Sequence, residues 1–414
     1  MKPATKHRLG AFALGPAVLL IAATAHAQPP TDPTTAQIRP IETVVATPEP
    51  SEPTSDSSFV HTAREWAKQT QLLERLEGTI DGWYPRLGGM TRGSGFTIGP
   101  GYRTHVFADR VLLDVSAAVS TRLYRAVDVR ARWLQAWHER AELWTEYRYE
   151  NYPQEDFFGL GPDTSPDART SYTLRGSDVV MRGSVKPMSW LRLGASVGYL
   201  TPRIGRGHDR AFPSIEQLFT DGTSPGLDAQ PDFVHTELSA DVDLRDVPGN
   251  PKSGTVYHAA YSTWNDRTLE QYNFRRFETR AAHYVPLTDD RRQGLSGHVG
   301  MTVVNNAPGD RVPFYALPHI GGIDTVRSYP EFRFKDENAL WFGAEYRWTP
   351  IPWASAVLFA DFGQVAHDWQ NMANGLKHGY GFGFRGHSAK KTFAQVDFGF
   401  GGGEGWRTFV KVGI

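Results

Sequence analysis

The sequence predicts an all-β protein, a transmembrane antiparallel β-barrel of sixteen strands with a short N-terminal helix. Three observations predict this fold. The chain opens with an export signal, which places the protein outside the cytoplasm. The mean hydropathy is −0.43, and no apolar run after the signal reaches the ~18 residues that a membrane helix needs. Aromatic residues nevertheless make up 12% of the chain, and apolar and polar residues alternate over long segments, as in membrane-spanning strands.

The N-terminus reads as a secretory signal peptide over residues 1–27. Basic residues precede an apolar stretch over 9–23, and an Ala-His-Ala cleavage site follows at 25–27. An uncleaved anchor is the alternative, but the apolar stretch is shorter than the ~18 to 20 residues of a spanning helix. We therefore expect export, and the absence of cysteine means that no disulfide stabilises the exported fold.

Three further segments follow the signal. Residues 28–60 are rich in Pro, Thr and Ser, which predicts a disordered linker. Residues 61–78 carry apolar residues at helical spacing after a possible capping box at Thr62 and Glu65, which predicts one short amphipathic helix. This helix could lie on the membrane, enter the barrel, bind a partner or pack on the rim. Residues 79–414 form the expected barrel.

The alternation has a period of two and persists over segments longer than ordinary sandwich strands. Between residues 233 and 245, apolar residues occupy even positions and charged residues gather at odd positions. Residues 190–200 and 339–348 repeat the pattern with opposite phases. Strands of a soluble sandwich usually have about 5 to 6 residues, so the longer alternation favours a membrane barrel.

Fifteen segments show this character directly, and single-chain barrels usually close with an even number of strands. The turn at 186–189 is short and the segment 201–232 is long, so the long one is expected outside the cell. A periplasmic N-terminus then requires one more strand, which we place at 82–92. The other segments are 93–107, 111–123, 127–135, 141–150, 172–186, 190–200, 233–246, 255–264, 273–286, 294–305, 339–348, 355–366, 379–387, 392–400 and 406–414.

Several motifs occur in a specific order near the C-terminus. Residues 319–329 read HIGGIDTVRSY, residues 340–350 read LWFGAEYRWTP, and residues 359–363 read FADFG. This order resembles the signature of the bacterial surface antigen superfamily, the BamA and TamA type of outer-membrane assembly barrel. The segments FFGLG at 157–161 and DLRDVPGNPKSG at 243–254 are further matches, so the resemblance covers residues 79–414.

The resemblance implies sixteen strands and a long sixth extracellular loop that folds back into the lumen. The matching loop tip is Val326, Arg327, Ser328 and Tyr329. Carried over by position, Arg327 is expected to meet Glu345 and Asp361 on the inner wall. Elementary electrostatics agrees, because a partly desolvated arginine is stable when it forks onto carboxylates. These six residues form the predicted structural loop lock.

The sequence departs from the family pattern at three points. Ser328 stands where the family usually has Gly, which would strain the tip if that position needs a positive φ. The chain ends in Ile414 rather than the usual aromatic residue. Family members that handle client proteins carry POTRA modules before the barrel, and 28–78 is too short for a typical folded domain. The resemblance thus implies a barrel-only member.

Two functions follow as expectations. The first is insertion or translocation of proteins or lipids in outer-membrane biogenesis, with outer-membrane lipids and client outer-membrane or secreted proteins as partners. Glycines in an early strand would weaken its ladder, or merely allow curvature; they are Gly93, Gly95, Gly99 and Gly101, with Pro100. The alternative is a passive pore or structural barrel lined by charges, or simply a solvated interior; the charges are Arg192, Glu237, Asp241, Arg276, Glu278 and Arg280.

An enzyme is not expected. The sequence contains no H-E-x-x-H and no phosphate-binding glycine loop. His208-Asp209 is an isolated pair in a long loop, and His235, His283 and His298 fall within strands, where hydrogen bonding is commoner than metal binding. We expect no catalytic residue, cofactor or metal. Lys and Arg number 44 against 45 Asp and Glu, which gives no attraction to nucleic acid. The oligomeric state is left open.

Overall fold

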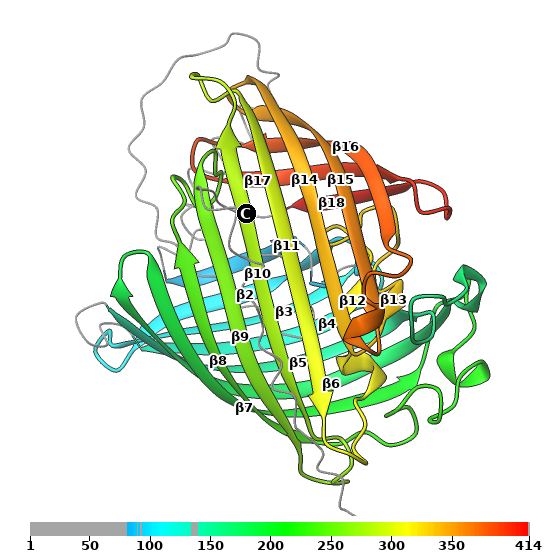
Figure 1. Cartoon of the computed structure of the whole chain (residues 1–414). Coiled ribbons are helices and arrows are strands. Elements are labelled where there is room, and N and C mark those ends of the chain that lie inside the picture. Colours follow the sequence, from blue (N-terminus) through cyan, green and yellow to red (C-terminus); the bar gives the residue numbers. More distant parts are fainter. Residues whose placement is uncertain (1–80, 89, 92, 134–139, 413–414) are drawn as a thin grey trace, which may run out of the picture.

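The computed structural model describes residues 81–88, 90–91, 93–133 and 140–412. Sixteen strands form one antiparallel sheet, and their order in the sheet is their order in the chain (Figure 1). The expected signal peptide, linker and amphipathic helix lie outside the described residues. No helix in the described part is long and apolar enough to cross a membrane. The predicted all-β, sixteen-stranded antiparallel architecture is confirmed.

The strand positions follow the predicted alternation closely, and the strand placed provisionally at 82–92 is present as β1. The strands of the large sheet are β1 (Gly82–Gly88), β2 (Thr97–Val106), β3 (Val111–Ser120), β4 (Arg125–Trp133), β5 (Ala141–Phe157), β6 (Thr170–Met188), β7 (Leu191–Arg206), β8 (Phe233–Asp243), β9 (Gly254–Asp266), β10 (Phe274–Pro286), β11 (Gln293–Asn306), β14 (Asn338–Ile351), β15 (Ala354–Ala366), β16 (Lys377–His387), β17 (Thr392–Phe400) and β18 (Arg407–Val412). Two short strands, β12 (His319–Ile320) and β13 (Phe334–Lys335), pair within a loop.

Strands β5, β6 and β7 are longer than the sequence predicts. The predicted ends at residues 150 and 200 are wrong, since β5 continues to Phe157 and β7 to Arg206. Pro153 makes the end of β5 hard to recognise in the sequence, because proline has no backbone N–H to donate to a neighbouring strand. It lies at an irregularity between Tyr152 and Glu155, where the register with β6 shifts. A bulge is a position at which a strand tolerates proline.

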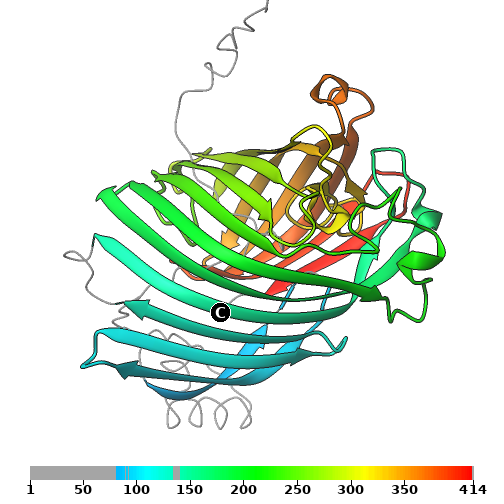
Figure 2. The same cartoon turned by 90° about the horizontal axis from the view of Figure 1, so that it is seen from below.

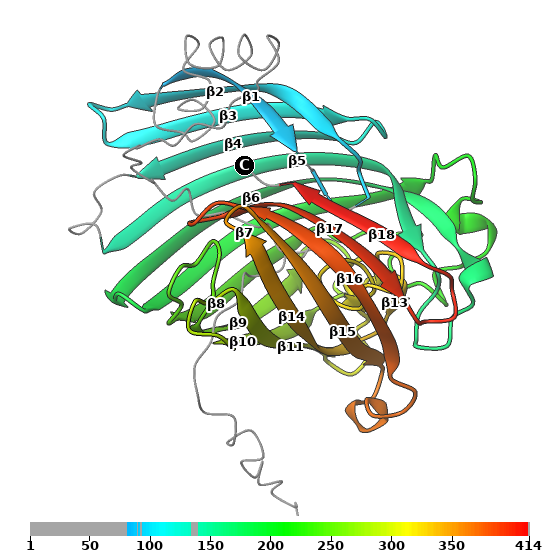
Figure 3. The ribbon, with the colours of Figure 1, turned by 90° about the horizontal axis from the view of Figure 1, so that it is seen from above.

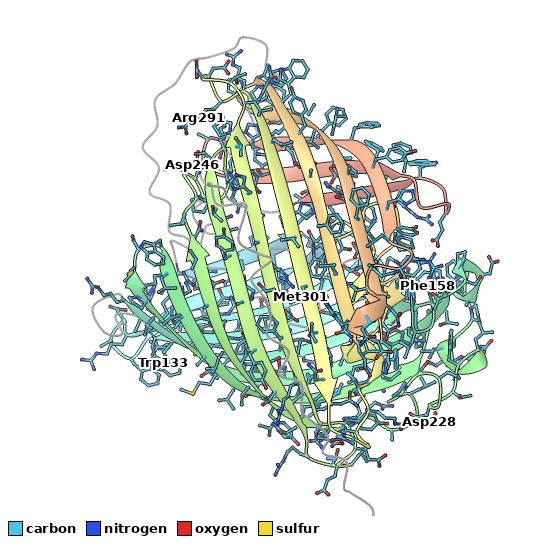
Figure 4. All side chains as sticks on the ribbon, in the orientation of Figure 1. Trp133, Phe158, Asp228, Asp246, Arg291 and Met301 are labelled. Carbon is cyan, nitrogen blue, oxygen red and sulfur yellow. The ribbon has the colours of Figure 1, made fainter. Side chains whose placement is uncertain are left out.

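The two ends of the sheet carry different connections. One end, here the long-loop end, carries the connections 207–232 and 307–337. The opposite end, here the short-turn end, has turns as brief as 189–190 and 352–353. Counted along the chain, 307–337 is the sixth connection at the long-loop end. Figure 4 labels Asp228 near the long-loop end and Arg291 near the short-turn end.

The two faces of the sheet differ in polarity as the alternation predicts. Outward-facing Leu238 and Leu358 are 64% and 59% exposed, whereas inward-facing Asp361 is fully buried. Exposed leucines of this kind would be costly against water but are stable against lipid. The sheet therefore presents an apolar outer surface and a polar inner one.

The edge strands β1 and β18 are not joined by a ladder among the described residues. Their C-terminal ends lie near each other, where a Cβ placed on Gly88 would lie 3.9 Å from the carbonyl oxygen of Val412 (Figure 3). The barrel wall thus has one seam whose backbone hydrogen bonds are not made between its two edges. We call the line between β1 and β18 the seam.

Strand β1 is held instead by side chains on the inner face. The Tyr84 hydroxyl donates to Asp114 at 2.6 Å, and Arg86 donates to Ser116 at 3.1 Å and is ion-paired with Asp128. These contacts reach past β2 to β3 and β4. Arg148 of β5 also binds Asp128, at 2.6 Å. A network of charges therefore ties β1 to the four strands that follow it.

The early glycines have separate roles. Gly93 and Gly95 are not in a strand, contrary to prediction; they lie before β2 with φ of 75° and 80°. Gly99 and Gly101 do lie in β2, and the Tyr84 ring covers Gly101 so closely that a Cβ there would lie 2.2 Å from the ring. A tyrosine that packs over a strand glycine supports the pairing of β1 with β2 rather than weakening it.

A packed aromatic cluster lies at the long-loop end. It combines the 207–232 and 307–337 connections with the ends of the neighbouring strands, and Phe314 at its centre is fully buried. The Phe314 ring lies 4.8 Å from that of Phe157 and 5.0 Å from that of Tyr172. Such close aromatic packing is typical of a protein core. The two longest connections therefore fold together.

Candidate functional site: an inward-folded loop

The sixth connection, residues 307–337, turns back along the inner face of the sheet. Strands β12 and β13 form its base, and β12 contacts β14 and β15. The connection is drawn in yellow to orange in Figure 2. Gly321 and Gly322 have φ of 110° and 96°, which other residues rarely adopt. The Glu331 carboxylate accepts from the Ile323 amide at 3.1 Å, closing the turn. The loop is thus a folded unit whose tip contains residues 326–329.

Arg327 lies in this tip and is 4% exposed. Its Nε and Nη2 donate to the two oxygens of Asp361 at 2.7 and 2.8 Å, a bidentate fork. Its Nη1 donates to Glu345 at 3.0 Å. The structure therefore brings Arg327, Glu345 and Asp361 together, the three residues that the resemblance places in contact. A forked, charge-assisted pair combines strength with a defined orientation.

Two further charged residues complete the cluster and were not predicted. Asp397 of β17 is fully buried and accepts from Arg327 Nη1 at 3.1 Å. Arg385 of β16 donates to Glu345 at 3.0 Å and is ion-paired with Asp397. Two guanidinium groups, one from the loop and one from β16, thus contact three carboxylates on β14, β15 and β17. Arg385 and Asp397 alternate with Phe384, Val396 and Phe398 along the sequence, a pattern that puts them on the polar inner face, but only the strand register brings them to Arg327.

The Phe359 ring packs against the guanidinium group of Arg327. The guanidinium carbon of Arg327 lies 3.5 Å from the centroid of the Phe359 ring, a cation–π contact. The ring in turn covers Gly381 on the next strand, where a Cβ would lie 2.5 Å from it. The motif FADFG therefore contributes two partners, the ring of Phe359 and the carboxylate of Asp361, to one side chain.

Four inward-facing glycines make room for the tip. A Cβ on Gly363 would lie 2.9 Å from the Val326 side chain, and one on Gly379 would lie 2.4 Å from the Ser328 hydroxyl. The corresponding distances are 1.8 Å from Gly399 to the carbonyl oxygen of Arg327 and 2.4 Å from Gly402 to the Tyr329 ring. Each residue of the predicted tip thus has its own glycine: three on strands β15, β16 and β17, and Gly402 in the connection after β17. Only glycine permits such close approach of loop and sheet.

Ser328 is accommodated without the strain considered from the sequence. It is not among the residues with positive φ; the nearby residue with that conformation is Phe332, at 59°. The Ser328 hydroxyl donates to the His378 carbonyl at 2.9 Å, a bond that glycine could not make. The serine therefore adds an attachment to β16 at this position.

Arg333 is a second attachment point that the sequence analysis did not identify. It is 1% exposed and donates to Glu404 at 2.7 Å and to the Thr164 hydroxyl at 2.7 Å. Glu404 lies between β17 and β18, and Thr164 lies between β5 and β6. Its guanidinium also faces the Phe158 and Phe334 rings at 4.9 and 4.3 Å. Arg333 thus joins the loop to two other connections at the long-loop end.

Replacing Arg333 by Ala is expected to lower the free energy of unfolding by about 1.5 to 3 kcal/mol, because hydrogen bonds to a charged group are lost and Glu404 stays partly buried. Urea unfolding in lipid vesicles, followed by tryptophan fluorescence, measures the change. Arg292→Ala is the control, since that side chain is 63% exposed. Equal effects of the two substitutions would contradict a structural role for Arg333.

The inner-wall charges considered as a channel lining are each ion-paired with the wall. The pairs are Arg192 with Glu142 at 3.6 Å, Glu237 with Arg182 at 3.7 Å, Asp241 with His258 at 2.7 Å, Arg276 with Glu278 at 3.3 Å and Arg280 with Glu278 at 3.7 Å. One pair joins the neighbouring strands β8 and β9, two link strands that are separated by one other strand, and two lie within β10. Each of these interior side chains therefore has a partner of opposite or hydrogen-bonding character nearby, as in a solvated barrel interior.

The histidines singled out in the sequence have separate partners. His208 contacts the Thr173 hydroxyl at 3.1 Å, whereas Asp209 pairs with Arg122 at 3.1 Å. No group of three or more potential metal ligands occurs within the described part of the chain. The strand histidines are His235, 3.0 Å from Asp178, His298, 3.9 Å from Asp361, and His283, half-buried in β10.

These features define a class of protein: a sixteen-stranded transmembrane β-barrel of the outer membrane, with its sixth connection folded inward. Residues 168–405 match the family model of the Omp85 superfamily domain. The chain belongs to the Omp85 superfamily. The resemblance to BamA-type barrels and the predicted outer-membrane location are thereby confirmed.

Solved structures align with most of the chain. BamA from Haemophilus ducreyi lacking POTRA domains 1–3 aligns with a TM-score of 0.59 at 12% identity, over 80% of this chain and 70% of that one. CdiB from Acinetobacter baumannii and CdiB from Escherichia coli align at 14% and 11% identity with TM-scores of 0.47 and 0.49, over 80% of this chain and 58% and 61% of theirs. No curated protein matches the sequence.

Proposed function

We propose that this barrel inserts or translocates client proteins or lipids at the outer membrane, and that the seam is where it acts. The observation that carries the proposal is the seam itself, because β1 and β18 form no ladder among the described residues. An unpaired strand edge can hydrogen-bond to another extended chain. The BamA and CdiB likeness supports the same role, which needs no catalytic group.

The bracing on either side of the seam supports this role. On one side, Arg86 and Tyr84 tie β1 to β3 and β4. On the other, Arg327 ties the loop to β14, β15 and β17, next to β18. The interactions are strong within each side, whereas no ladder crosses between them. A wall built in this way separates along the seam before it loosens elsewhere.

Closing the seam is expected to abolish activity. The chain has no cysteine, so Leu87→Cys and Val412→Cys introduce the only two thiols, both on exposed outward-facing residues. A flexible bis-maleimide joins them. The readout is the folding rate of a small unfolded outer-membrane protein added to vesicles that contain the barrel. We expect faster folding than in empty vesicles and loss of the acceleration after cross-linking.

Two controls make the seam experiment specific. A monofunctional maleimide on the same cysteines should leave the acceleration intact. Cysteines at Val197 and Thr236, which are partners in the β7–β8 ladder, should be cross-linked without effect because those strands are already joined. Folding no faster than in empty vesicles would refute the proposed function, and equal loss with both cross-links would refute the role of the seam.

The passive pore is the alternative, and conductance distinguishes it. The loop tip is folded inward, with Arg327 only 4% exposed, so we expect the wild-type barrel to remain closed in a planar bilayer. Replacing residues 321–331 by a short Gly-Ser linker should produce open events, since those residues hold the loop inside. A steady, large conductance of the wild type would favour the pore.

A further inference from the structure

The connection between β8 and β9, residues 244–253, crosses the short-turn end to reach the turn between β16 and β17. The Gly249 carbonyl accepts from the Thr392 amide at 2.9 Å, and Gly249 forms an isolated parallel bridge with Lys391. A Cβ on Gly249 would lie 2.3 Å from the carbonyl oxygen of Lys390. Because β10, β11, β14 and β15 separate the two places in the sheet, this connection spans part of the opening. We call residues 244–253 the strap.

Asn250 secures the strap to the inner wall and is 3% exposed. Its amide nitrogen donates to the Ser388 carbonyl at 2.9 Å and lies 3.3 Å from the His387 ring nitrogen Nδ1. Its side-chain oxygen accepts from Arg347 at 3.2 Å. The other ring nitrogen of His387 contacts the Ser355 hydroxyl at 2.7 Å. Every polar atom of the asparagine side chain therefore has a partner on the wall.

The order Ser355, His387, Asn250 has the spacing of a nucleophilic triad, but its surroundings favour a structural role. Ser355 is 2% exposed, and its hydroxyl also contacts that of Thr349 at 2.9 Å. A nucleophile needs open space in which a substrate can approach its oxygen. These polar groups instead form a closed network that fixes the end of the strap.

A chain of polar contacts leads from the strap to the loop tip. Arg347, which binds Asn250, lies 3.9 Å from one carboxylate oxygen of Glu345. The other oxygen of Glu345 accepts from Arg327 at 3.0 Å and from Arg385 at 3.0 Å. One carboxylate is thus shared between the strap side and the loop side. Glu345 therefore contacts both the arginine that binds the strap and the arginine of the loop tip.

We propose that the strap closes part of the short-turn end and is coupled to the inward-folded loop through Arg347 and Glu345. When the strap detaches, Arg347 loses its hydrogen bond to Asn250 and forms a closer ion pair with Glu345. The ion pair between Glu345 and Arg327 is thereby weakened. When the loop tip leaves, Glu345 is free to pair fully with Arg347. The coupling is reciprocal, as thermodynamic linkage requires.

The test measures how readily the loop tip leaves its site. Ser328 is fully buried, so a single Ser328→Cys in the cysteine-free chain reports release by its labelling rate with a water-soluble maleimide. The purified full chain is used in detergent, and heat-modifiability on gels verifies folding of each variant. We expect Asn250→Ala to raise the labelling rate several-fold. In an Arg347→Met background the same substitution should have no further effect.

Two variants separate coupling from general loosening. Arg291→Ala removes a rim contact of the strap, the 3.3 Å pair with Asp246, without touching Arg347, and should leave labelling of Ser328→Cys unchanged. Gly249→Val displaces the strap sterically and should act as Asn250→Ala does. A second reporter, Lys252→Cys, records movement of the strap itself.

Three outcomes overturn the proposal. Faster labelling of Lys252→Cys with no change at Ser328→Cys would show a strap that moves without the loop. If Asn250→Ala changed the labelling rate of Ser328→Cys equally in the wild-type and Arg347→Met backgrounds, the coupling would not pass through Arg347. Unchanged labelling at both reporters would show that Asn250 and Gly249 do not hold a strap. None of these results depends on a client protein, so the inference stands or falls separately from the insertion role.

Discussion

Replacing Arg327 by Ala is expected to lower the free energy of unfolding by about 3 to 5 kcal/mol, the cost of breaking a buried ion pair from one side. Asp361 and Asp397 are both fully buried, and without Arg327 the carboxylate of Asp361 loses its bidentate partner. The cation–π contact with Phe359 is lost as well. Urea unfolding in lipid vesicles and heat-modifiability on semi-native gels both report the change.

Two substitutions accompany this measurement. Arg327→Lys keeps the positive charge but cannot fork onto both oxygens of Asp361, so it should recover only part of the loss. Arg291→Ala is the matched control, because that arginine is 53% exposed and its pair with Asp246 is worth about 1 kcal/mol or less. Indistinguishable stabilities of Arg327→Ala and Arg291→Ala would contradict the proposed lock.

Replacing Gly399 by Ala is expected to displace the loop tip. The added Cβ would lie 1.8 Å from the carbonyl oxygen of Arg327 and 3.2 Å from the Ser328 amide nitrogen. Both are backbone atoms, so no side-chain rotation relieves the clash. Overpacking of this kind costs about 1 to 3 kcal/mol, and the loop can avoid it only by leaving the wall. The labelling rate of Ser328→Cys and the unfolding midpoint should both change.

Gly297→Ala is the control for that substitution. Gly297 is also a strand glycine, but its nearest contact to an added Cβ is 3.8 Å, from the carbonyl oxygen of Gly343. It should leave both readouts close to wild type. If Gly399→Ala unfolds at the wild-type midpoint with Ser328→Cys still protected, then the close fit between tip and wall does not hold the loop.

The fold could be predicted from the sequence because a strand pattern is local. Alternation depends only on which neighbour faces lipid and which faces the interior, and it placed fifteen of the sixteen strands; the strand at 82–92 followed from the even number of strands that a closed barrel usually has. The prediction of strand ends failed where a residue that disfavours strands lies inside one, as Pro153 does in β5. The glycines before β2 were misassigned for the same reason, since composition does not distinguish a turn with positive φ from a strand.

The contacts of Arg327 were anticipated only where a motif existed. Glu345 and Asp361 lie in segments that resemble the family signature, whereas Arg385 and Asp397 lie in segments without one. Their inward direction followed from alternation, but their meeting at one point depends on register across β14 to β17. Register is set by turns and packing over the whole sheet.

The sequence alone therefore predicted the compartment and the all-β class, because both depend on neighbours along the chain. The number of strands needed the even closure of barrels as well, and the loop tip was predicted from the family resemblance. The folded molecule decided which charges share Glu345, which glycines face the tip, how Arg333 joins three connections, and where the strap lands. These are contacts between residues tens to hundreds of positions apart. Only closure of the strands into one wall brings such residues within hydrogen-bonding distance.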